Sequence, residues 1–331
     1  MYAYRGEGKC RMRIMYGIKP ILTQKDFLEM GELTPEQLAD LLDLAGELKA
    51  RMQAGYSDLP LKGKILGMIF EKNSTRTRVS FETGMLQLGG SAIFMSGHDS
   101  QLGRGEPISD TAKVLSEYVD GLMIRTHEHK RSQVLAENAS VPVINGLTDF
   151  EHPCQALADL LTIKEIKGDL AGLKLAYIGD GNNVAHSLLY AGALAGMHVV
   201  CAAPPGYEPN KEVVEAARKM AQATGAHVDV VVDPYEAAKN ADVLYCDVWT
   251  SMGQEQENEK RLKDFTGYQV NEMLTAYAKE DYLFMHCLPA HRGEEVTASV
   301  IDSEHSVVIK QAGNRLHAQK ALLVDLMATP R

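Results

Sequence analysis

The sequence contains no long apolar run and no dense basic segment, and both absences restrict the partners it can have. No uninterrupted apolar stretch reaches the roughly 18 residues of a membrane-spanning helix, so we expect a soluble protein. The formal net charge is -10, and basic residues nowhere form a cluster. Nucleic acid and anionic membranes are therefore not expected as partners, and an anionic ligand would have to be bound by local groups.

Paired cysteines are missing as well. The five cysteines are scattered without a Cys-x-x-Cys pair, at Cys10, Cys154, Cys201, Cys246 and Cys287. This pattern indicates neither a disulfide framework nor a zinc knuckle, and it predicts a reducing, cytoplasmic location.

The N-terminal segment lacks the apolar core of a secretory signal, although it carries several arginines and lysines. We expect residues 1–20 to form a poorly ordered extension, with a transit peptide as an open alternative. Met12 and Met15 lie inside this segment and are alternative start positions.

The chain has 331 residues, 45% of them hydrophobic, which is more than one core of about 150 residues normally holds. We therefore expect two domains. Residues 21–151 would form the first, with a C-terminal helix at 314–331 packing back on it, and residues 152–313 would form the second.

Strand-like and helix-like segments alternate in both halves. In the first half, strands are expected at Ile65–Phe70, Ala92–Met95 and Gly121–Arg125, and helices from the cap at Thr34, at Val79–Leu88 and at Asp110–Val119. In the second half, the expected strands are Lys174–Ile178, His198–Ala202, Val228–Val232, Val243–Val248 and Tyr282–Cys287. The helices between them are expected at Ala185–Ala195, Lys211–Ala223, Tyr235–Lys239 and Tyr268–Ala278.

This alternation predicts an α/β fold in which each domain is a mostly parallel sheet flanked by helices. The segments His152–Leu161 and Asn314–Met327 have helical periodicity and would join the domains. Because ligands of such folds bind at the carboxyl ends of the strands, polar residues that follow a strand are candidates for function.

Residues 73–80 follow the strand Ile65–Phe70 and have the sequence Asn-Ser-Thr-Arg-Thr-Arg-Val-Ser. A helix that begins here offers unpaired N–H groups and the positive end of its dipole. Hydroxyl groups add further donors, and the Arg76 guanidinium matches the geometry of phosphate oxygens. The segment predicts a phosphate site, and the simpler alternative is a polar helix cap with two solvated arginines.

Gly179-Asp180-Gly181-Asn182-Asn183 also follows a strand and begins like a dinucleotide-binding fingerprint. The third glycine is absent, since Val184 occupies that place, and no acidic residue follows at the expected distance. Nicotinamide binding is therefore disfavoured. The two asparagines instead suggest amide donors for a polar substrate, or an ordinary turn.

The segment from Asp247 to Gly253 places a carboxylate at a strand end and a turn of small residues just after it. A carboxylate there can hold an ammonium group, and the N–H groups of the turn can hold a carboxylate. Together these groups match the two ends of an α-amino acid, although Asp247 alone is equally consistent with a helix cap.

Two further segments carry reactive side chains. One is His152-Pro153-Cys154-Gln155, and the other is His286-Cys287-Leu288-Pro289-Ala290-His291-Arg292. Nucleophilic catalysis by Cys287 would need a nearby base, and a metal site would need further ligands. A structural histidine or a buried cysteine is the ordinary alternative for each.

Taken together, five ordered segments resemble the aspartate and ornithine carbamoyltransferase family, and the resemblance extends from about Leu22 to Met327. They are Ser74–Arg78, Arg125-Thr126-His127, His152–Gln155, Asp247–Gly253 and His286–Pro289. Within the family, Ser-Met-Gly after Asp-Val-Trp and the His-Cys-Leu-Pro segment resemble the ornithine-specific branch. The N-terminal extension is the one departure of note.

The resemblance implies two sets of substrate-binding residues. The residues implied for carbamoyl phosphate are Ser74, Thr75, Arg76, Thr77, Gln101, Arg125, His152, Gln155, Cys287, Leu288 and Arg315, with Arg125, His152 and Cys287 in the catalytic role. Those implied for ornithine are Asn183, Asp247, Ser251 and Met252. The first domain would thus bind carbamoyl phosphate and the second ornithine, and Gln101 would reach the site of a neighbouring subunit, which implies a homotrimer or a multiple of it.

The expected reaction is attack of the ornithine δ-amine on carbamoyl phosphate, which yields citrulline and phosphate and requires neither a metal nor an organic cofactor. The alternatives are a carbamoyltransferase for another amine such as putrescine, a nucleotide-dependent oxidoreductase, and a non-catalytic relative that binds an amino acid. The sequence does not distinguish a biosynthetic from a catabolic direction.

Overall fold

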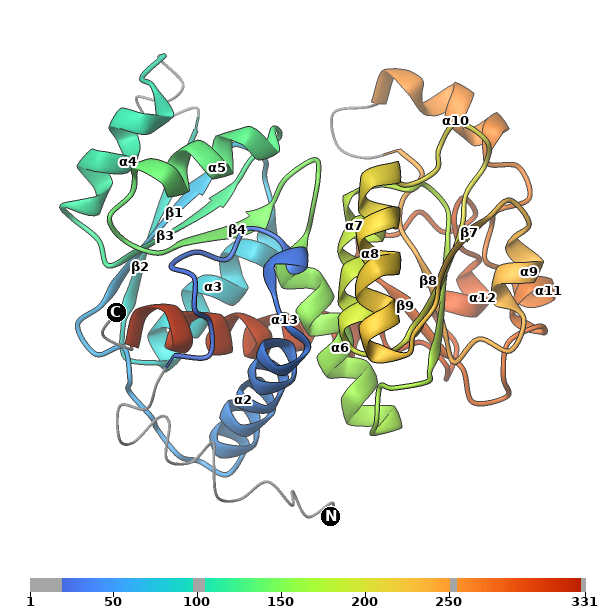
Figure 1. Cartoon of the computed structure of the whole chain (residues 1–331), viewed down its shortest axis with the longest axis horizontal. Coiled ribbons are helices and arrows are strands. Elements are labelled where there is room, and N and C mark those ends of the chain that lie inside the picture. Colours follow the sequence, from blue (N-terminus) through green and yellow to red (C-terminus); the bar gives the residue numbers. More distant parts are fainter. Residues whose placement is uncertain (1–19, 98–104, 251–254, 329–331) are drawn as a thin grey trace. The chain divides into compact units, whose positions relative to one another are not determined.

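The computed structural model describes residues 20–97, 105–250 and 255–328. The chain divides into two compact units. Unit 1 comprises Met1–Asp149 and Arg315–Arg331, and unit 2 comprises Phe150–Asn314. Figure 1 shows that each unit contains a sheet with helices packed against it. No helix among the described residues is both long and apolar enough to cross a membrane.

Unit 1 is built on a four-stranded sheet in the order β2-β1-β3-β4, and every neighbouring pair is parallel. Its strands are β1 (Ile65–Phe70), β2 (Ser91–Ser96), β3 (Gly121–Arg125) and β4 (Val143–Leu147). The helices of this half are α2 (Pro35–Gln53), α3 (Thr75–Gln87), α4 (Ile108–Ser116) and α5 (His129–Asn138). Helix α13 (Val308–Leu323) crosses the boundary at residue 314, and a π-helical turn at Val324–Ala328 follows it.

Unit 2 contains a five-stranded parallel sheet in the order β7-β6-β5-β8-β9. Its strands are β5 (Lys174–Ile178), β6 (His198–Ala202), β7 (Val228–Val231), β8 (Val243–Cys246) and β9 (Leu283–His286). The longer helices are α6 (Pro153–Lys167), α7 (Asn183–Leu194) and α8 (Lys211–Thr224). The short ones are α9 (Pro234–Ala238), α10 (Asn258–Asp264), α11 (Glu272–Thr275) and α12 (Ala298–Ile301). Two parallel sheets flanked by helices confirm the predicted fold class.

The start of α2 has the geometry that its sequence predicts. The Thr34 hydroxyl accepts from the Gln37 backbone N–H at 3.2 Å, and the Gln37 side-chain oxygen accepts from the Thr34 N–H at 2.9 Å. These reciprocal bonds satisfy two donors that a helix start otherwise leaves open. The leucine face of α2 is buried, as expected.

Other expectations were wrong or incomplete. Residues 268–278 do not form one helix, because Val270 pairs with Val296 in an isolated bridge and only Glu272–Thr275 is helical. Helix α3 begins at Thr75, four residues before the expected Val79. Helix α5 was not anticipated, and neither was β4, whose sequence contains a buried asparagine and a glycine.

The C-terminal part of α13 and the turn after it pack on residues of unit 1. Gln319 donates to the Ser80 hydroxyl at 2.8 Å, and Lys320 donates to Gln87 at 3.1 Å. The buried Asp325 carboxylate accepts from the N–H groups of Ile21 and Leu22 at 2.6 and 3.0 Å. One carboxylate therefore holds the first described segment of the chain against the last.

This anchor can be tested by Asp325→Ala, which leaves two backbone donors without their acceptor. We expect the free energy of unfolding, measured by chemical denaturation, to fall by roughly 2–4 kcal/mol. Asp302→Ala is the control, since it removes a solvent-exposed ion pair with Arg292 and should change stability little. Equal stability of the two variants would contradict the anchoring role.

Candidate active site

The phosphate segment of unit 1 forms the first turn of α3. Ser74 is its N-cap: the Ser74 hydroxyl accepts from the Thr77 N–H at 3.2 Å and lies 3.1 Å from the Thr77 hydroxyl. Thr75 and Arg76 occupy the first two helical positions, and Thr77 is buried. A helix start with an extended cap residue and neighbouring hydroxyl and guanidinium groups is suited to bind an anion.

A buried arginine from α13 extends this constellation. Arg315 donates from Nη2 to the Thr77 hydroxyl at 3.2 Å and from Nε to Gln319 at 3.0 Å, and it is only 2% exposed. Gln319 in turn contacts Ser80 of α3. The structure thus brings together Thr77 and Arg315, which lie 238 residues apart in the sequence.

Arg125 is the last residue of β3 and pairs in register with Phe70, the last residue of β1. Both the Arg125 side chain and the start of α3 therefore follow the carboxyl edge of the same sheet. The nearby Glu71 carboxylate accepts from Arg131 at 2.9 and 2.5 Å, and it also contacts the Thr126 hydroxyl. This pairing compensates the charge of the acidic residue that follows β1.

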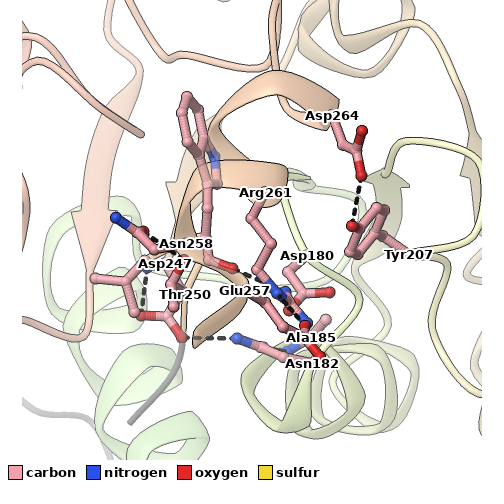
Figure 2. A network of polar contacts seen from close by, with 12 residues as sticks. Asp180, Asn182, Ala185, Tyr207, Asp247, Thr250, Glu257, Asn258, Arg261 and Asp264 are labelled. Atoms are coloured by element: carbon pink, nitrogen blue, oxygen red, sulfur yellow. Dashed lines mark hydrogen bonds and ion pairs between the residues drawn. The ribbon is translucent and has the colours of Figure 1, made fainter. Parts of the chain in front are cut away.

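In unit 2, the Asp247 carboxylate is held by residues that follow three neighbouring strands. Its Oδ2 accepts from Asn182 at 2.9 Å, and its Oδ1 accepts from the Cys287 thiol at 3.0 Å and from the Val248 N–H at 2.8 Å. Asn182 follows β5, Asp247 follows β8 and Cys287 follows β9. Figure 2 shows Asp247 and the Asn182 amide facing one another.

The two adjacent asparagines have different positions. Asn182 is the N-cap of α7, with its side-chain oxygen accepting from the Val184 and Ala185 N–H groups and its nitrogen committed to Asp247. These bonds use the Asn182 oxygen and one of the two hydrogens of its amide nitrogen, so the suggestion that Asn182 donates to a substrate stays a prediction. Asn183 is the first residue of α7 and is half-buried.

His152 and Gln155 lie at the start of α6, and both are buried. The His152 N–H donates to the Ser187 hydroxyl at 2.9 Å. Gln155 donates from Nε2 to Asp159 at 2.8 Å, which leaves its side-chain oxygen as the acceptor end of the amide.

Ser251 and Met252 lie outside the described residues, as does Gln101. The residues that flank 251–254 are joined to one another. Arg261 of α10 donates to the Trp249 carbonyl at 2.8 Å. It also donates to Asp180 at 2.7 Å and to Glu257 at 3.0 Å, and Figure 2 shows these two acids beside it. Thr250 donates to Asn258 at 2.8 Å. The sequence analysis missed Arg261, because an arginine in a short helix carries no local signal of such contacts.

Matches to known proteins cover nearly the whole chain. The model of the carbamoyl-phosphate-binding domain of the aspartate/ornithine carbamoyltransferases matches residues 25–165, and that of their Asp/Orn-binding domain matches residues 171–326. The chain belongs to the aspartate/ornithine carbamoyltransferase family. It is an enzyme of that family, as the resemblance seen in the sequence predicts.

Individual members of this carbamoyltransferase family are similar over nearly their full length. The chain is 60% identical to "Ornithine carbamoyltransferase" of Anoxybacillus flavithermus over 306 residues, which are 92% of this chain and 98% of the relative. It is 59% identical to that of Geobacillus stearothermophilus, over 92% of this chain and 98% of the relative. The solved ornithine carbamoyltransferase of Pyrococcus furiosus is 52% identical, with a TM-score of 0.91, over 95% of this chain and all of that one.

One group of side chains that could bind a metal in this carbamoyltransferase is already engaged in hydrogen bonds. Potential ligand atoms of Asp247, His286 and Cys287 lie within 4.8 Å of one another. However, both ring nitrogens of His286 have partners, at the Leu288 N–H and the Glu295 carboxylate. The absence of a metal from the predicted chemistry stays a prediction.

Asp180 lines an open polar cavity of about 610 Å³ in unit 2. The cavity is also lined by Tyr207, Glu257, Lys260, Arg261 and Asp264. Burial raises the pKa of Asp180 to about 6, although the Arg261 guanidinium favours its charged form. The carboxyl is therefore neutral below about pH 6 and negative above it, and only the negative form completes the ion pair with Arg261.

Because Arg261 also holds the Trp249 carbonyl, protonation of Asp180 should change the surroundings of Trp249, the single tryptophan. We expect tryptophan fluorescence to titrate with a midpoint near pH 6. Asp180→Asn should remove this transition, whereas Asp264→Asn, which alters another acid of the same cavity, should retain it. A transition that persists unchanged in Asp180→Asn would assign it to another group.

Proposed function

We propose that this chain transfers the carbamoyl group of carbamoyl phosphate to the δ-amine of L-ornithine, giving L-citrulline and phosphate. The observation that carries the proposal is the 60% identity, across both units, with relatives named ornithine carbamoyltransferase. The contacts within each unit support it, because one set of residues suits a phosphate and the other suits an amino acid.

The phosphate of carbamoyl phosphate is assigned to Ser74, Thr75, Arg76 and Thr77. We assign the N–H groups and hydroxyls of the first turn of α3 as donors, of which the Thr77 N–H bonds to the Ser74 hydroxyl in this structure, and the helix dipole favours a dianion. Arg315 supports the assignment, since it brings a buried guanidinium to Thr77. A positive site of this kind is needed locally, given a net charge of -10.

The carbamoyl group is assigned to Arg125, His152 and Gln155, together with Cys287 and the Leu288 backbone. The Gln155 amide nitrogen donates to Asp159, and we assign its side-chain oxygen as the acceptor for the carbamoyl NH₂. Arg125 and His152 would donate to the carbonyl oxygen, on which negative charge grows during attack. Removing one donor of this type typically slows a reaction about 10²–10³-fold.

Ornithine is assigned to Asn183 and Asp247, with Ser251 and Met252 as the further predicted contacts. Among the described residues, the Asp247 carboxylate accepts hydrogen bonds from Asn182, Val248 and Cys287. A carboxylate has about four acceptor positions, and we assign the α-ammonium group to a further position on Oδ2. The Cys287 thiol lies 3.0 Å from the same carboxylate, which places sulfur next to the assigned amino-acid position.

The reaction needs the δ-amine in its neutral form. The amine nitrogen forms a bond to the carbamoyl carbon, the bond from that carbon to the phosphate oxygen breaks, and the departing phosphate accepts the amine proton. The protein residues orient both substrates and stabilise charge on the carbonyl oxygen, which is positioning and electrostatic catalysis. No side chain has to act as a dedicated base.

A citrulline assay tests the function directly. We expect product with ornithine, and little or none when putrescine or aspartate replaces it at the same concentration. Putrescine lacks the α-carboxylate and α-ammonium that the assigned residues would hold, so equal rates with putrescine would favour the alternative carbamoyltransferase. The trimeric assembly and the cytoplasmic location stay predictions.

Arg76→Ala tests the phosphate assignment. We expect kcat/KM to fall roughly 100-fold or more, because hydrogen bonds to a charged group contribute roughly 1.5–3 kcal/mol each. Arg51→Ala is a suitable control in the same unit: Arg51 lies on α2, and the variant loses its ion pair with Asp58 but no assigned substrate contact. A variant that keeps more than about a tenth of the wild-type value would remove Arg76 from the phosphate site.

Asp247→Asn tests the amino-acid assignment by steady-state kinetics with each substrate varied. The KM for ornithine should rise at least about tenfold more than that for carbamoyl phosphate, since an amide lacks the charge that pairs with an ammonium group. Asp242→Asn is the matched control, because Asp242 lies at the opposite end of β8 and binds Lys279. Similar changes for both substrates would contradict the role of Asp247.

A further inference from the structure

A buried histidine immediately precedes the Cys287-Leu288 segment. His286 is the last residue of β9, and its side chain and that of Glu295 are both 0% exposed. Its Nδ1 lies 2.8 Å from the Leu288 backbone nitrogen, and its Nε2 lies 3.2 Å from the Glu295 carboxylate. The ring therefore joins a segment assigned to substrate binding to a buried acid.

These two contacts determine which ring nitrogen carries the proton. A backbone N–H can only donate, so Nδ1 must present its lone pair to Leu288. Nε2 then carries the proton and donates it to Glu295. The carboxylate acts as the orienting group, because it fixes both the tautomer and the plane of the imidazole.

Leu288 needs such support because of its backbone. Its φ is +59°, in the left-handed region that a residue with a Cβ rarely adopts. Asn240 is the other non-glycine residue with a positive φ in the part of the chain that the structure describes, and asparagine tolerates this region far better than leucine. A conformation of this kind persists only where surrounding contacts impose it.

The contacts around His286 enclose the turn that contains Leu288. The same Glu295 oxygen accepts from the His291 N–H at 2.6 Å, so both ends of the turn are tied to one buried pair. On the other side, the His286 N–H donates to Gln311 at 3.0 Å, and Gln311 donates to Asp159 at 2.7 Å. Asp159 also accepts from Gln155, so the histidine shares a buried network with a residue assigned to the carbamoyl group.

We propose that His286, oriented by Glu295, is a positioning residue that holds the Leu288 backbone in its left-handed conformation and so places Cys287 and the Leu288 carbonyl for the reaction. The inference deepens the proposed carbamoyl transfer to ornithine and rests on it. His286 itself contacts no substrate in this scheme, and its effect passes through the N–H of Leu288.

Two near-isosteric variants separate the contacts of the ring. In His286→Asn, the side-chain oxygen is attached to Cγ like Nδ1 and can still accept from Leu288. In His286→Gln, the side-chain nitrogen takes the place of Nε2 and can still donate to Glu295, but no acceptor is left for Leu288. Each variant loses one of the two hydrogen bonds of the imidazole, so a purely structural role predicts similar effects for both.

We expect His286→Asn to keep kcat/KM for ornithine within about threefold of wild type and His286→Gln to lower it about 30-fold or more. The KM for carbamoyl phosphate should change less than kcat/KM for ornithine in both, because only its carbamoyl group is assigned to Cys287 and Leu288, whereas its phosphate is assigned to unit 1. Equal losses in the two variants, or a His286→Gln enzyme as active as wild type, would overturn the proposal.

A second readout does not depend on activity. Hydrogen exchange of the Leu288 amide should stay slow in wild type and His286→Asn and become fast in His286→Gln, and unchanged exchange in His286→Gln would also overturn the proposal. If wild type made no citrulline, the proposed function would fail while this measurement still tested the histidine. If the His286 variants did not fold, two variants of Glu295 would test the same contact. Glu295→Gln keeps an acceptor for Nε2 and should remain active, whereas Glu295→Leu should not. Equal activity of these two variants would count against the proposal.

Discussion

The hydrogen bonds on the Asp247 carboxylate depend on the order of the strands in unit 2. Asn182, Asp247 and Cys287 follow β5, β8 and β9, which are neighbours in the sheet. Parallel strands bring their carboxyl ends to one edge, so residues 65 and 40 positions from Asp247 reach the same two oxygens. A buried acid needs such partners, since burial of an unpaired charge is costly. The order of the strands therefore determines which side chains can reach the Asp247 carboxylate.

Unit 1 uses the same edge of a parallel sheet for the opposite charge. There the chain supplies N–H groups at the start of α3 and guanidinium groups at Arg76, Arg125 and Arg315, and Arg131 pairs with the nearby Glu71. Because the protein has a net charge of -10, the positive potential that these donors create is confined to this part of unit 1.

Features that depend only on residues close together in the sequence could be predicted, whereas features that depend on tertiary contacts could not. The capping box at Thr34 and the strand before Ser74 depend on neighbouring residues and were predicted correctly, and the strand before Asp247 was predicted two residues too long, to Val248 instead of Cys246. Strand β4 escaped prediction because Asn145 and Gly146 interrupt its apolar pattern, and tertiary contacts decide both: Asn145 donates to the Leu28 carbonyl, and a Cβ at Gly146 would lie 2.6 Å from the Met123 sulfur. The contacts of Arg261 and the bond between Asn182 and Asp247 could not be predicted either, because each joins residues that lie far apart in the sequence. The family resemblance, and not spacing, is what singled out Arg315.

The buried polar groups of unit 2 form a network whose members have little freedom to change separately. Gln311 accepts from the His286 N–H and donates to Asp159 and Tyr245, so its amide can take only one orientation. Asp159 then fixes Gln155 in the same way. Inside a protein each such bond polarises the next, and a single unpaired member costs more than an ordinary surface contact contributes. The orientation of the Gln155 amide therefore depends on Asp159, Gln311 and Tyr245, and a change at any one of these buried polar side chains would reach the others.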